Sequence, residues 1–271
     1  MQLIDSHSHF DDPRFDTDRR EVYLRARRQG VCAQVVPAVT RARWPGLTLI
    51  CNSYPGLFPA YGLHPMFTVQ HDPTDIAALD RQLQESPAVA VGECGLDFQI
   101  DDHDRAAQIE LFEAQLELAM KHKLPLIIHA RKAVEEVIRL LRGNPGLRGV
   151  LHSYSGSEQQ ASQLFAMGFL VSFGGPLTYP RATRLRRLAG TLPLASMMLE
   201  SDAPDQPDAD IRGQRNEPAR VARVVQALAE LRSESCDEIA ARTTANAIEL
   251  FALSPSSSWS DGCRRSFQEL T

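Results

Sequence analysis

The sequence lacks an apolar run long enough to cross a bilayer, and its most apolar stretches have only the length of a strand. Its first ten residues, MQLIDSHSHF, contain neither a basic leader nor a long apolar segment, so we expect no signal peptide. The five cysteines are odd in number and share no CxxC spacing, which argues against a disulfide framework and a zinc ribbon. We therefore expect reduced thiols, a cytoplasmic location and no membrane partner.

An excess of positive charge is also missing, because the formal net charge is −5. A wide basic face, of the kind that coats duplex nucleic acid, is therefore not expected. A small site that holds one or two phosphates stays open, because bound metal ions can supply positive charge locally.

The 271 residues contain eight short apolar runs, rich in β-branched side chains and separated by segments of helix length. The runs span residues 2–5, 31–37, 57–65, 88–95, 124–130, 148–154, 168–175 and 196–202. Continuous apolar runs indicate strands that are buried on both faces, as in a parallel sheet covered by helices.

Amphipathic helix patterns lie between these runs. The clearest are at 104–122, 132–142 and 217–231. In the first, Ile109, Phe112, Leu116 and Met120 fall on one stripe at spacings of three and four, which predicts a buried face.

Eight alternating strands and helices favour a single-domain α/β fold, the closed (β/α)8 TIM-type barrel. An open doubly wound sheet is the alternative. We expect the barrel to span residues 1–253 and a polar tail to span residues 254–271, where the composition becomes rich in serine.

Side chains that can bind a metal or a substrate follow nearly every predicted strand. In the first, His7 and His9 are separated by one residue, so in an extended chain they share a face and can reach one metal. Later runs end at metal-competent side chains in the same way: Glu93, His129, His152 and Asp202. Because the C-terminal strand ends of a barrel face one mouth, four histidines and two carboxylates are expected to converge there.

A single histidine after a strand is more often a hydrogen-bonded structural residue than a ligand. Here five of the eight histidines fall at strand ends beside two carboxylates, which favours a metal site. The remaining three, His71, His103 and His122, lie in loop or helix contexts and are expected on the surface.

Mixed imidazole and carboxylate ligands suit Zn²⁺, Mn²⁺, Fe²⁺ or Co²⁺, and Mg²⁺ is a further candidate. Six ligands exceed what one tetrahedral site needs, so two ions per chain are favoured. Two ions roughly 3.5–4 Å apart can activate a water, polarise a phosphoryl oxygen and stabilise the leaving oxygen.

Seven short motifs follow one another along the chain: D-S-H-S-H-F, Y-G-L-H-P, V-G-E-C-G-L-D, I-I-H-A-R, L-H-S-Y-S-G, L-E-S-D-A-P and R-N-E-P. In this order they resemble the motifs of the TatD-type metal-dependent deoxyribonucleases. Each is common alone, but together they span residues 5–218, about four-fifths of the chain. Cys94, Leu151 and Tyr154 depart from the family pattern, whereas no ligand position is substituted.

The resemblance implies a first metal site formed by four residues: His7, His9, Glu93 and Asp202. It implies a second site formed by Glu93, His129 and His152, with Glu93 as the bridge between the two ions. Asp202 and Glu93 would therefore be the catalytic residues, and Asp202 is the candidate general base that orients or deprotonates the attacking water.

The resemblance also implies an activity, the hydrolysis of phosphodiester bonds in DNA or nucleotides. The family commonly attacks single strands from the 3′ end, as a 3′-5′ exonuclease with a metal-activated water as the nucleophile. A mouth-shaped site that accepts a strand terminus needs no extended basic groove, which agrees with the net charge.

His64, Arg131 and Asn216 are placed to contact a phosphate of the substrate, and purely structural roles are the alternative. Asp97 is expected to support the fourth strand's loop or a ligand histidine. Metal-bound imidazoles usually donate their second N–H to such a partner.

A metal-dependent amidohydrolase, lactonase or deaminase acting on a small molecule is the main alternative, since a fold does not fix its chemistry. Many dinuclear amidohydrolases have a bridging lysine on strand four, whereas this chain has Glu93, which favours the nuclease. A non-catalytic metal-binding barrel is the second alternative. No feature of the sequence indicates an oligomer, so we expect a monomer.

Overall fold

A computed structural model describes residues 1–99 and 104–254 of the chain. The expectations for His103 and for residues 255–271 of the polar tail lie outside these residues. Among the described residues, no helix is both long enough and apolar enough to cross a membrane.

The eight predicted strands are present, although several are shorter than predicted. They are β1 (Leu3–Asp5), β2 (Val31–Pro37), β3 (Leu57–Tyr61), β4 (Ala90–Asp97), β5 (Leu126–Arg131), β6 (Gly149–Leu151), β7 (Phe169–Phe173) and β8 (Met197–Leu199). They form one sheet in which the strands follow the order of the sequence. The described pairings are parallel.

The first and last strands are joined where they end. The backbone N–H of Ser6 donates to the carbonyl of Leu199 at 3.0 Å, and the Ser6 hydroxyl donates to the same oxygen at 2.9 Å. Sequential strand order with such a bond is that of a barrel, whereas an open doubly wound sheet reverses its order part of the way across. The predicted (β/α)8 fold is confirmed, and the open-sheet alternative is wrong.

Helices separate the strands. The α-helices are α1 (Arg19–Arg28), α2 (Trp44–Ser53), α3 (Asp75–Glu85), α4 (Arg105–His122), α5 (Val134–Arg142), α6 (Glu158–Ala166), α7 (Thr183–Thr191), α8 (Val221–Ala229) and α9 (Cys236–Phe251). The 3-10 helices are η1 (Pro13–Phe15), η2 (Arg41–Arg43), η3 (Pro65–Gln70), η4 (Gly175–Thr178), η5 (Leu194–Ser196), η6 (Ala209–Ile211) and η7 (Pro218–Arg220).

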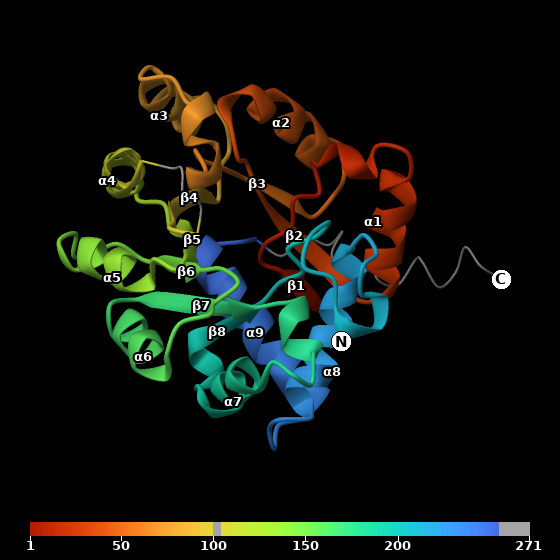
Figure 1. The fold of residues 1–271 in the computed structure, drawn as a ribbon. Helices are drawn as coiled ribbons and strands as arrows, with labels where there is room; N and C mark the ends of the chain where they lie inside the picture. Colours follow the sequence, from red (N-terminus) through yellow and green to blue (C-terminus); the bar gives the residue numbers. More distant parts are fainter. Residues whose placement is uncertain (100–103, 255–271) are drawn as a thin grey trace. The chain divides into compact units, whose positions relative to one another are not determined.

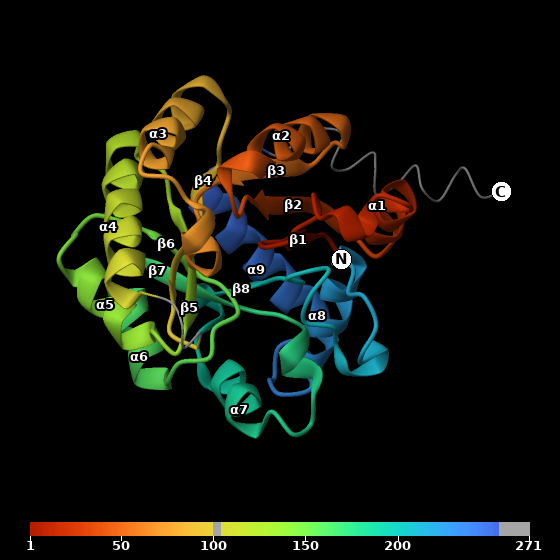
Figure 2. The same ribbon diagram turned by 45° about the horizontal axis from the view of Figure 1, so that its top comes forward.

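The chain divides into two compact units. The first comprises Met1–Val36, Leu49–Phe58 and the chain from Ser172 on. In it, α9 packs against β1 and β8, and α8 packs against α9 (Figure 1). The second comprises Pro37–Thr48 and Pro59–Val171, and there α4 packs against β4 and α5 packs against α6 (Figure 2).

Helix α4 begins and ends where its capping residues allow. The Asp104 carboxylate accepts the N–H groups of the first turn, and Lys123 ends the helix in the left-handed conformation, with φ 56°. Phe112 and Leu116 are fully buried, as the stripe predicts, but Met120 is 47% exposed, so that part of the prediction is wrong.

The buried face of α4 carries two glutamines that bind the backbone of segments packed against the helix. Gln115 accepts the N–H of Leu63 at 2.8 Å through Oε1 and donates to the carbonyl of Leu63 at 3.0 Å through Nε2. Gln108 binds the N–H and the carbonyl of Asp97 at 2.8 and 3.0 Å in the same way. Both amides are satisfied although they are fully buried. Helix α4 thereby fixes the backbone beside His64 and at Asp97.

The helix predicted at 217–231 begins with the short helix η7 and continues as α8. Its predicted apolar stripe is confirmed, because Val221, Val224, Val225 and Leu228 are all at most 1% exposed. Pro218 begins the 3-10 turn, where its missing N–H leaves no unsatisfied donor.

Candidate metal centre

The first group of candidate ligands, the β1/β8 group, consists of His7, His9 and Asp202. It lies in the first unit, just beyond the ends of β1 and β8. His7 Nε2 and His9 Nε2 are 3.3 Å apart, and Oδ1 of Asp202 lies 3.5 and 3.6 Å from them. The His7 side chain is fully buried, whereas those of His9 and Asp202 are 15% and 11% exposed, so solvent can reach the group.

These separations fit a metal site. Donor atoms bound at ~2.1 Å around a tetrahedral ion lie ~3.4 Å from one another, given tetrahedral angles. The three donor atoms of the β1/β8 group are spaced in this way, and two imidazole nitrogens with a carboxylate oxygen suit several divalent transition metals. An ion could therefore bind all three with little movement of the side chains.

Asp5 fixes the backbone that carries the β1/β8 group. Its buried carboxylate accepts the N–H and the hydroxyl of Ser201 at 2.9 and 2.5 Å and the N–H of His7 at 3.3 Å. Burial raises the pKa of Asp5 to about 8, although these hydrogen bonds act in the opposite direction. Asp5 thus ties the end of β1 to the segment that holds Asp202. The sequence shows Asp5 only as one more carboxylate at a strand end, so this role was missed.

Asp202 has a backbone conformation that is uncommon for a residue with a side chain. Its φ of 53° lies in the left-handed region, where residues other than glycine are often functional. The N–H of Asp202 donates to the carbonyl of His7 at 2.9 Å, and Nε2 of Gln206 donates to its Oδ2 at 2.5 Å. These bonds leave Oδ1 directed at the two histidines.

Asn216 organises the loop that follows β8. It is 1% exposed, and its side-chain Nδ2 donates to the carbonyls of Ser201, Asp205 and Gln206 at 2.8, 2.9 and 3.2 Å. The amide therefore holds the turn around Asp202 from within. These bonds favour the structural alternative for Asn216, and its direct contact with a substrate stays a prediction.

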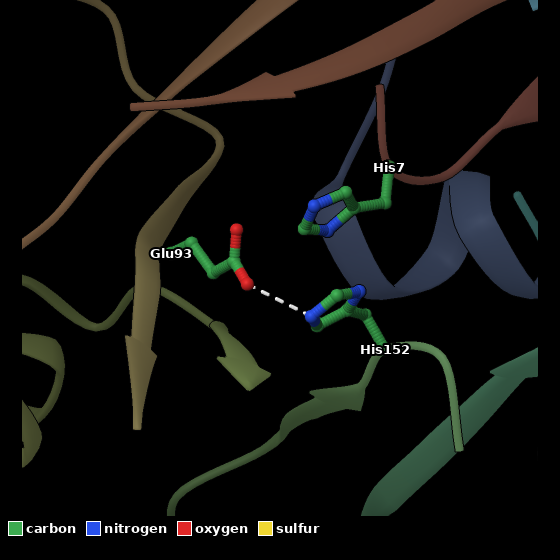
Figure 3. Close-up of side chains that lie close together, drawn as sticks. All are labelled: His7, Glu93 and His152. Carbon is green, nitrogen blue, oxygen red and sulfur yellow. Dashed lines mark ion pairs between the residues drawn. The ribbon is translucent and has the colours of Figure 1, made fainter. Parts of the chain in front are cut away.

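The second group, the β4–β6 group, consists of Glu93 in β4, His129 in β5 and His152 just beyond β6, all in the second unit. Oε1 of Glu93 lies 2.8 Å from His152 Nε2 and 3.1 Å from His129 Nδ1, and the two nitrogens are 3.2 Å apart. Figure 3 shows the Glu93 carboxylate and the His152 ring turned toward each other. The N–H of His152 donates to the carbonyl of Ile128, which fixes the start of its loop.

Asp97 determines which nitrogen of His129 faces Glu93. Its Oδ2 lies 3.0 Å from His129 Nε2. Burial raises the pKa of Asp97, but the hydrogen bonds from His129 and from the N–H of Gln99, with the nearby positive charges, together lower it, so the carboxylate is an ionised acceptor. His129 must then carry a hydrogen on Nε2, and its Nδ1 faces Glu93.

The β4–β6 group also fits a cation. Burial lowers the pKa of His129, yet its hydrogen bonds with Asp97 and Glu93 raise it overall. A lone pair on His129 Nδ1 and a carboxylate oxygen 3.1 Å away are both acceptors, so a proton or a metal ion must lie between them. A proton takes that place in the metal-free protein, and a divalent ion can replace it.

Asp97→Ala is expected to weaken divalent-metal binding by the β4–β6 group about 10–100-fold, because the imidazole of His129 loses the partner that orients it. The measurement is a competition titration against a chromophoric chelator. Asp80→Ala is the matched control, since Asp80 also binds a histidine, His122, at 2.7 Å. Equal affinity in the two variants would show that Asp97 does not support a metal ligand.

The other predicted substrate residues lie at different depths. His64 is 5% exposed, and its Nε2 is 2.9 Å from Oε1 of Glu93. Arg131 ends β5 and is exposed. Burial raises the pKa of Asp97, and the charge of Arg131 is one of the smaller effects that lower it. The structure thus brings His64 to the β4–β6 group and leaves Arg131 facing solvent. Substrate contact by either stays a prediction.

The surface prediction for His71 holds only in part, because the residue is partly exposed. The residue is half-buried, and Nε2 donates to the carbonyl of His64 at 2.9 Å across η3, which is kinked at Phe67. Burial lowers the pKa of His71. No periodicity in this short segment could have indicated that contact.

Two glycines allow close backbone approach beside the β4–β6 group, Gly62 just after β3 against β4 and Gly92 in β4 against β5. A Cβ on Gly62 would lie 2.6 Å from the carbonyl carbon of Gly92, and one on Gly92 would lie 2.7 Å from the Cβ of Ile127. Larger residues would therefore push apart the segments that carry His64 and Glu93.

Comparisons with known proteins show which family the chain belongs to. Residues 4–252 match the family described as TatD related DNase. The chain is 40% identical over 253 residues to the uncharacterized metal-dependent hydrolase YjjV of Escherichia coli (strain K12), covering 92% of this chain and 98% of that protein. It is 34% identical over 248 residues to the 3′-5′ ssDNA/RNA exonuclease TatD of Erwinia amylovora, covering 88% and 95%. The crystal structure of Escherichia coli YjjV, a TatD homologue, matches with a TM-score of 0.89 at 39% identity, over 93% and 98% of the two chains.

The barrel and its two histidine–carboxylate groups place this protein among the metal-dependent hydrolases with a TIM-barrel fold. Within that class, the chain belongs to the TatD-related DNase family, because the family match extends over nearly the whole barrel. The resemblance and the enzyme class inferred from the seven motifs are confirmed.

Proposed function

We propose that the protein hydrolyses phosphodiester bonds in DNA and removes nucleotides from the 3′ end of single strands. The observation that carries this proposal is the pair of histidine–carboxylate groups, with the glutamate Glu93 rather than a lysine on β4. Support comes from the family's description as TatD related DNases and from the relative named a 3′-5′ ssDNA/RNA exonuclease.

We propose further that the chain binds two divalent ions. One ion would be held by the β1/β8 group together with Glu93, and the other by the β4–β6 group, so that Glu93 is a ligand of both. Such ions supply Lewis-acid activation of water and of the phosphoryl group when they are bound. Zn²⁺, Mn²⁺, Mg²⁺, Fe²⁺ and Co²⁺ all remain candidates, because ligand sets of this kind accept several ions and cellular supply selects among them.

The protein's own side chains would orient the substrate and move a proton. Asp202 is the proposed general base: Gln206 holds its Oδ2, Oδ1 faces the histidines, and the carboxylate can accept a proton from the attacking water. Arg131 would place its exposed guanidinium on a phosphate of the substrate. Asn216 is the other residue proposed at the substrate. For His64, which lies 2.9 Å from Glu93, substrate contact is the alternative to a role in holding that carboxylate.

The net charge of −5 also bears on the substrate. Duplex-coating proteins gain much of their affinity from the counterions that a broad basic face releases from DNA. The composition of this chain has no excess of positive charge for such a face. A site that accepts the end of a single strand needs only the local charge of the ions and a few arginines. We infer that affinity for long duplex DNA is low.

Hydrolysis of a C–N or C–O bond in a small molecule is the second candidate. It is favoured by relatives that are named only as metal-dependent hydrolases. Glu93 on β4 argues against it, because many dinuclear amidohydrolases have a lysine on that strand.

An end-labelled single-stranded DNA, incubated with metal-stripped protein, is expected to stay intact until a divalent ion is restored. Mg²⁺, Mn²⁺ and Zn²⁺ would be added back separately, with label at the 3′ or the 5′ end. Immediate loss of a 3′ label, with gradual shortening of 5′-labelled strands, would establish the direction of attack. Ions that bind while the DNA stays intact in every condition would reject the nuclease and make the small-molecule hydrolase the leading hypothesis.

A further inference from the structure

His64 contacts Glu93, the carboxylate of the β4–β6 group. Its Nε2 is 2.9 Å from Oε1 of Glu93, and His129 Nδ1 approaches that oxygen at 3.1 Å. By distance alone, His64, Glu93 and His129 could hold one metal ion. The hydrogen bonds of each ring determine whether its inward-facing nitrogen has a lone pair to offer.

The backbone determines the tautomer of His64. The N–H of Met66 points at His64 Nδ1 at 3.0 Å, where the His64 side chain caps η3. A backbone N–H can only donate, so Nδ1 must carry the lone pair and no hydrogen. In a neutral imidazole the hydrogen is then on Nε2, the atom that faces Glu93. An Nε2–H has no lone pair with which to bind a metal.

His129 has the same tautomer but presents its other nitrogen. Its Nε2–H donates to Asp97, so Nδ1 is the nitrogen that faces Glu93. The hydrogen that His64 presents to the Glu93 carboxylate is its neutral ring's own N–H, whereas the proton between His129 Nδ1 and Glu93 can leave and free a lone pair for an ion. Distances alone make the two histidines look equivalent, whereas their partners make only His129 a ligand.

We propose that His64 is a positioning residue whose Nε2–H holds the Glu93 carboxylate for metal binding, and that it is not a metal ligand. This inference rests on the proposed binding of ions by Glu93. A carboxylate oxygen has lone pairs for both a cation and a hydrogen bond, and ligating carboxylates are commonly hydrogen-bonded in this way.

Neighbouring residues restrain the ring and its backbone in this orientation. Gln115 clamps the backbone of Leu63, and His71 donates from Nε2 to the carbonyl of His64 at 2.9 Å. The ring of Phe67 meets the His64 ring edge to face, with centroids 5.9 Å apart. A ring flip would break the bond from Met66 and turn a carbon toward Glu93.

Two substitutions of His64 distinguish a hydrogen-bond donor from a metal ligand. His64→Gln keeps an N–H donor at a similar reach, whereas His64→Ala removes it. We expect both variants to bind two equivalents of Zn²⁺ at saturation, measured by elemental analysis. The Ala variant should bind about 10–100-fold more weakly, with a lower kcat and an unchanged KM, and the Gln variant should recover most of both losses.

His122→Gln is the matched control, because His122 is a histidine of the same unit that binds only Asp80 among the partners described for its side chain. It should behave as the unaltered protein. Loss of one equivalent of Zn²⁺ in both His64 variants would show that His64 is a ligand. A raised KM with unchanged metal affinity and kcat would make it a substrate contact. Either outcome overturns the proposal.

Nitrogen NMR of histidine side chains tests the tautomer directly in the zinc-loaded protein. The His64 ring, assigned by its absence from the His64→Gln spectrum, is expected to show hydrogen on Nε2 and none on Nδ1. Hydrogen on Nδ1, or zinc coordination at Nε2, would contradict the proposal. Zinc binding and NMR need no DNA, so a failure of the proposed nuclease activity would be recognised separately.

Discussion

Glu93→Ala is expected to bind neither divalent ion at concentrations that saturate the unaltered protein, and to leave end-labelled DNA intact. The Glu93 carboxylate is 1% exposed and is the proposed ligand of both ions, so alanine removes one donor from each site. Elemental analysis after dialysis gives the metal content, and gel electrophoresis gives the activity. A variant with full activity would reject Glu93 as the bridge between the ions.

His152→Ala is the comparison for this variant, because it should lose only the ion of the β4–β6 group. Thermal unfolding gives an independent readout: an ion at 100 times its Kd stabilises the folded protein by about 2.7 kcal/mol. In a chain of this size, that corresponds to a rise in Tm of about 5–10 °C. The rise should be absent in Glu93→Ala. Loss of both ions in His152→Ala would show that the division into two groups is wrong.

Asp202→Asn is expected to lower kcat for single-stranded DNA by about 10²–10⁴-fold, because the isosteric amide cannot accept a proton from water. The ion held by the β4–β6 group should remain, since Asp202 is not among its ligands. Single-turnover kinetics with Mn²⁺ at saturating DNA would measure the chemical step without product release.

Asp205→Asn is the matched control in the same loop. Asp205 is 57% exposed in its side chain and pairs with Arg14 at 2.7 Å, and such surface pairs contribute about 0–1 kcal/mol. Its kcat should stay close to that of the unaltered protein. Equal rates for the two Asn variants would remove Asp202 from the role of base.

The strands were predictable because buried parallel strands appear as continuous apolar runs, whatever the rest of the chain does. Their ends were less certain, since hydrogen bonding to a neighbouring strand decides where a strand stops. The run 57–65 contains β3 only as far as Tyr61, and the run 196–202 contains only Met197–Leu199 as β8. His64 and Asp202 therefore lie in loops, where backbone conformations such as the left-handed φ of Asp202 can occur.

The face of helix α4 shows where periodicity fails. Apolar spacing predicted Met120 in the buried stripe, but Met120 is exposed and Gln108 and Gln115 are fully buried. Glutamine is buried here because both ends of each amide find backbone partners on Leu63 and Asp97. Those partners lie in other segments, just beyond β3 and at the end of β4, so a local pattern carries no signal of them.

The sequence by itself determined the barrel and the residue types at its strand ends, because strand and helix periods are local properties of the chain. The spacing of His7 and His9 likewise placed both rings on one side of an extended segment before any fold was known. Only the tertiary structure decided which nitrogen each imidazole turns toward a carboxylate. His64 and His129 both follow predicted strand runs, yet Met66 makes Nε2 of His64 a donor, whereas Asp97 turns Nδ1 of His129 toward the carboxylate as the nitrogen that can bind an ion. That choice depends on where distant segments place hydrogen-bond partners, and no sequence pattern specifies it.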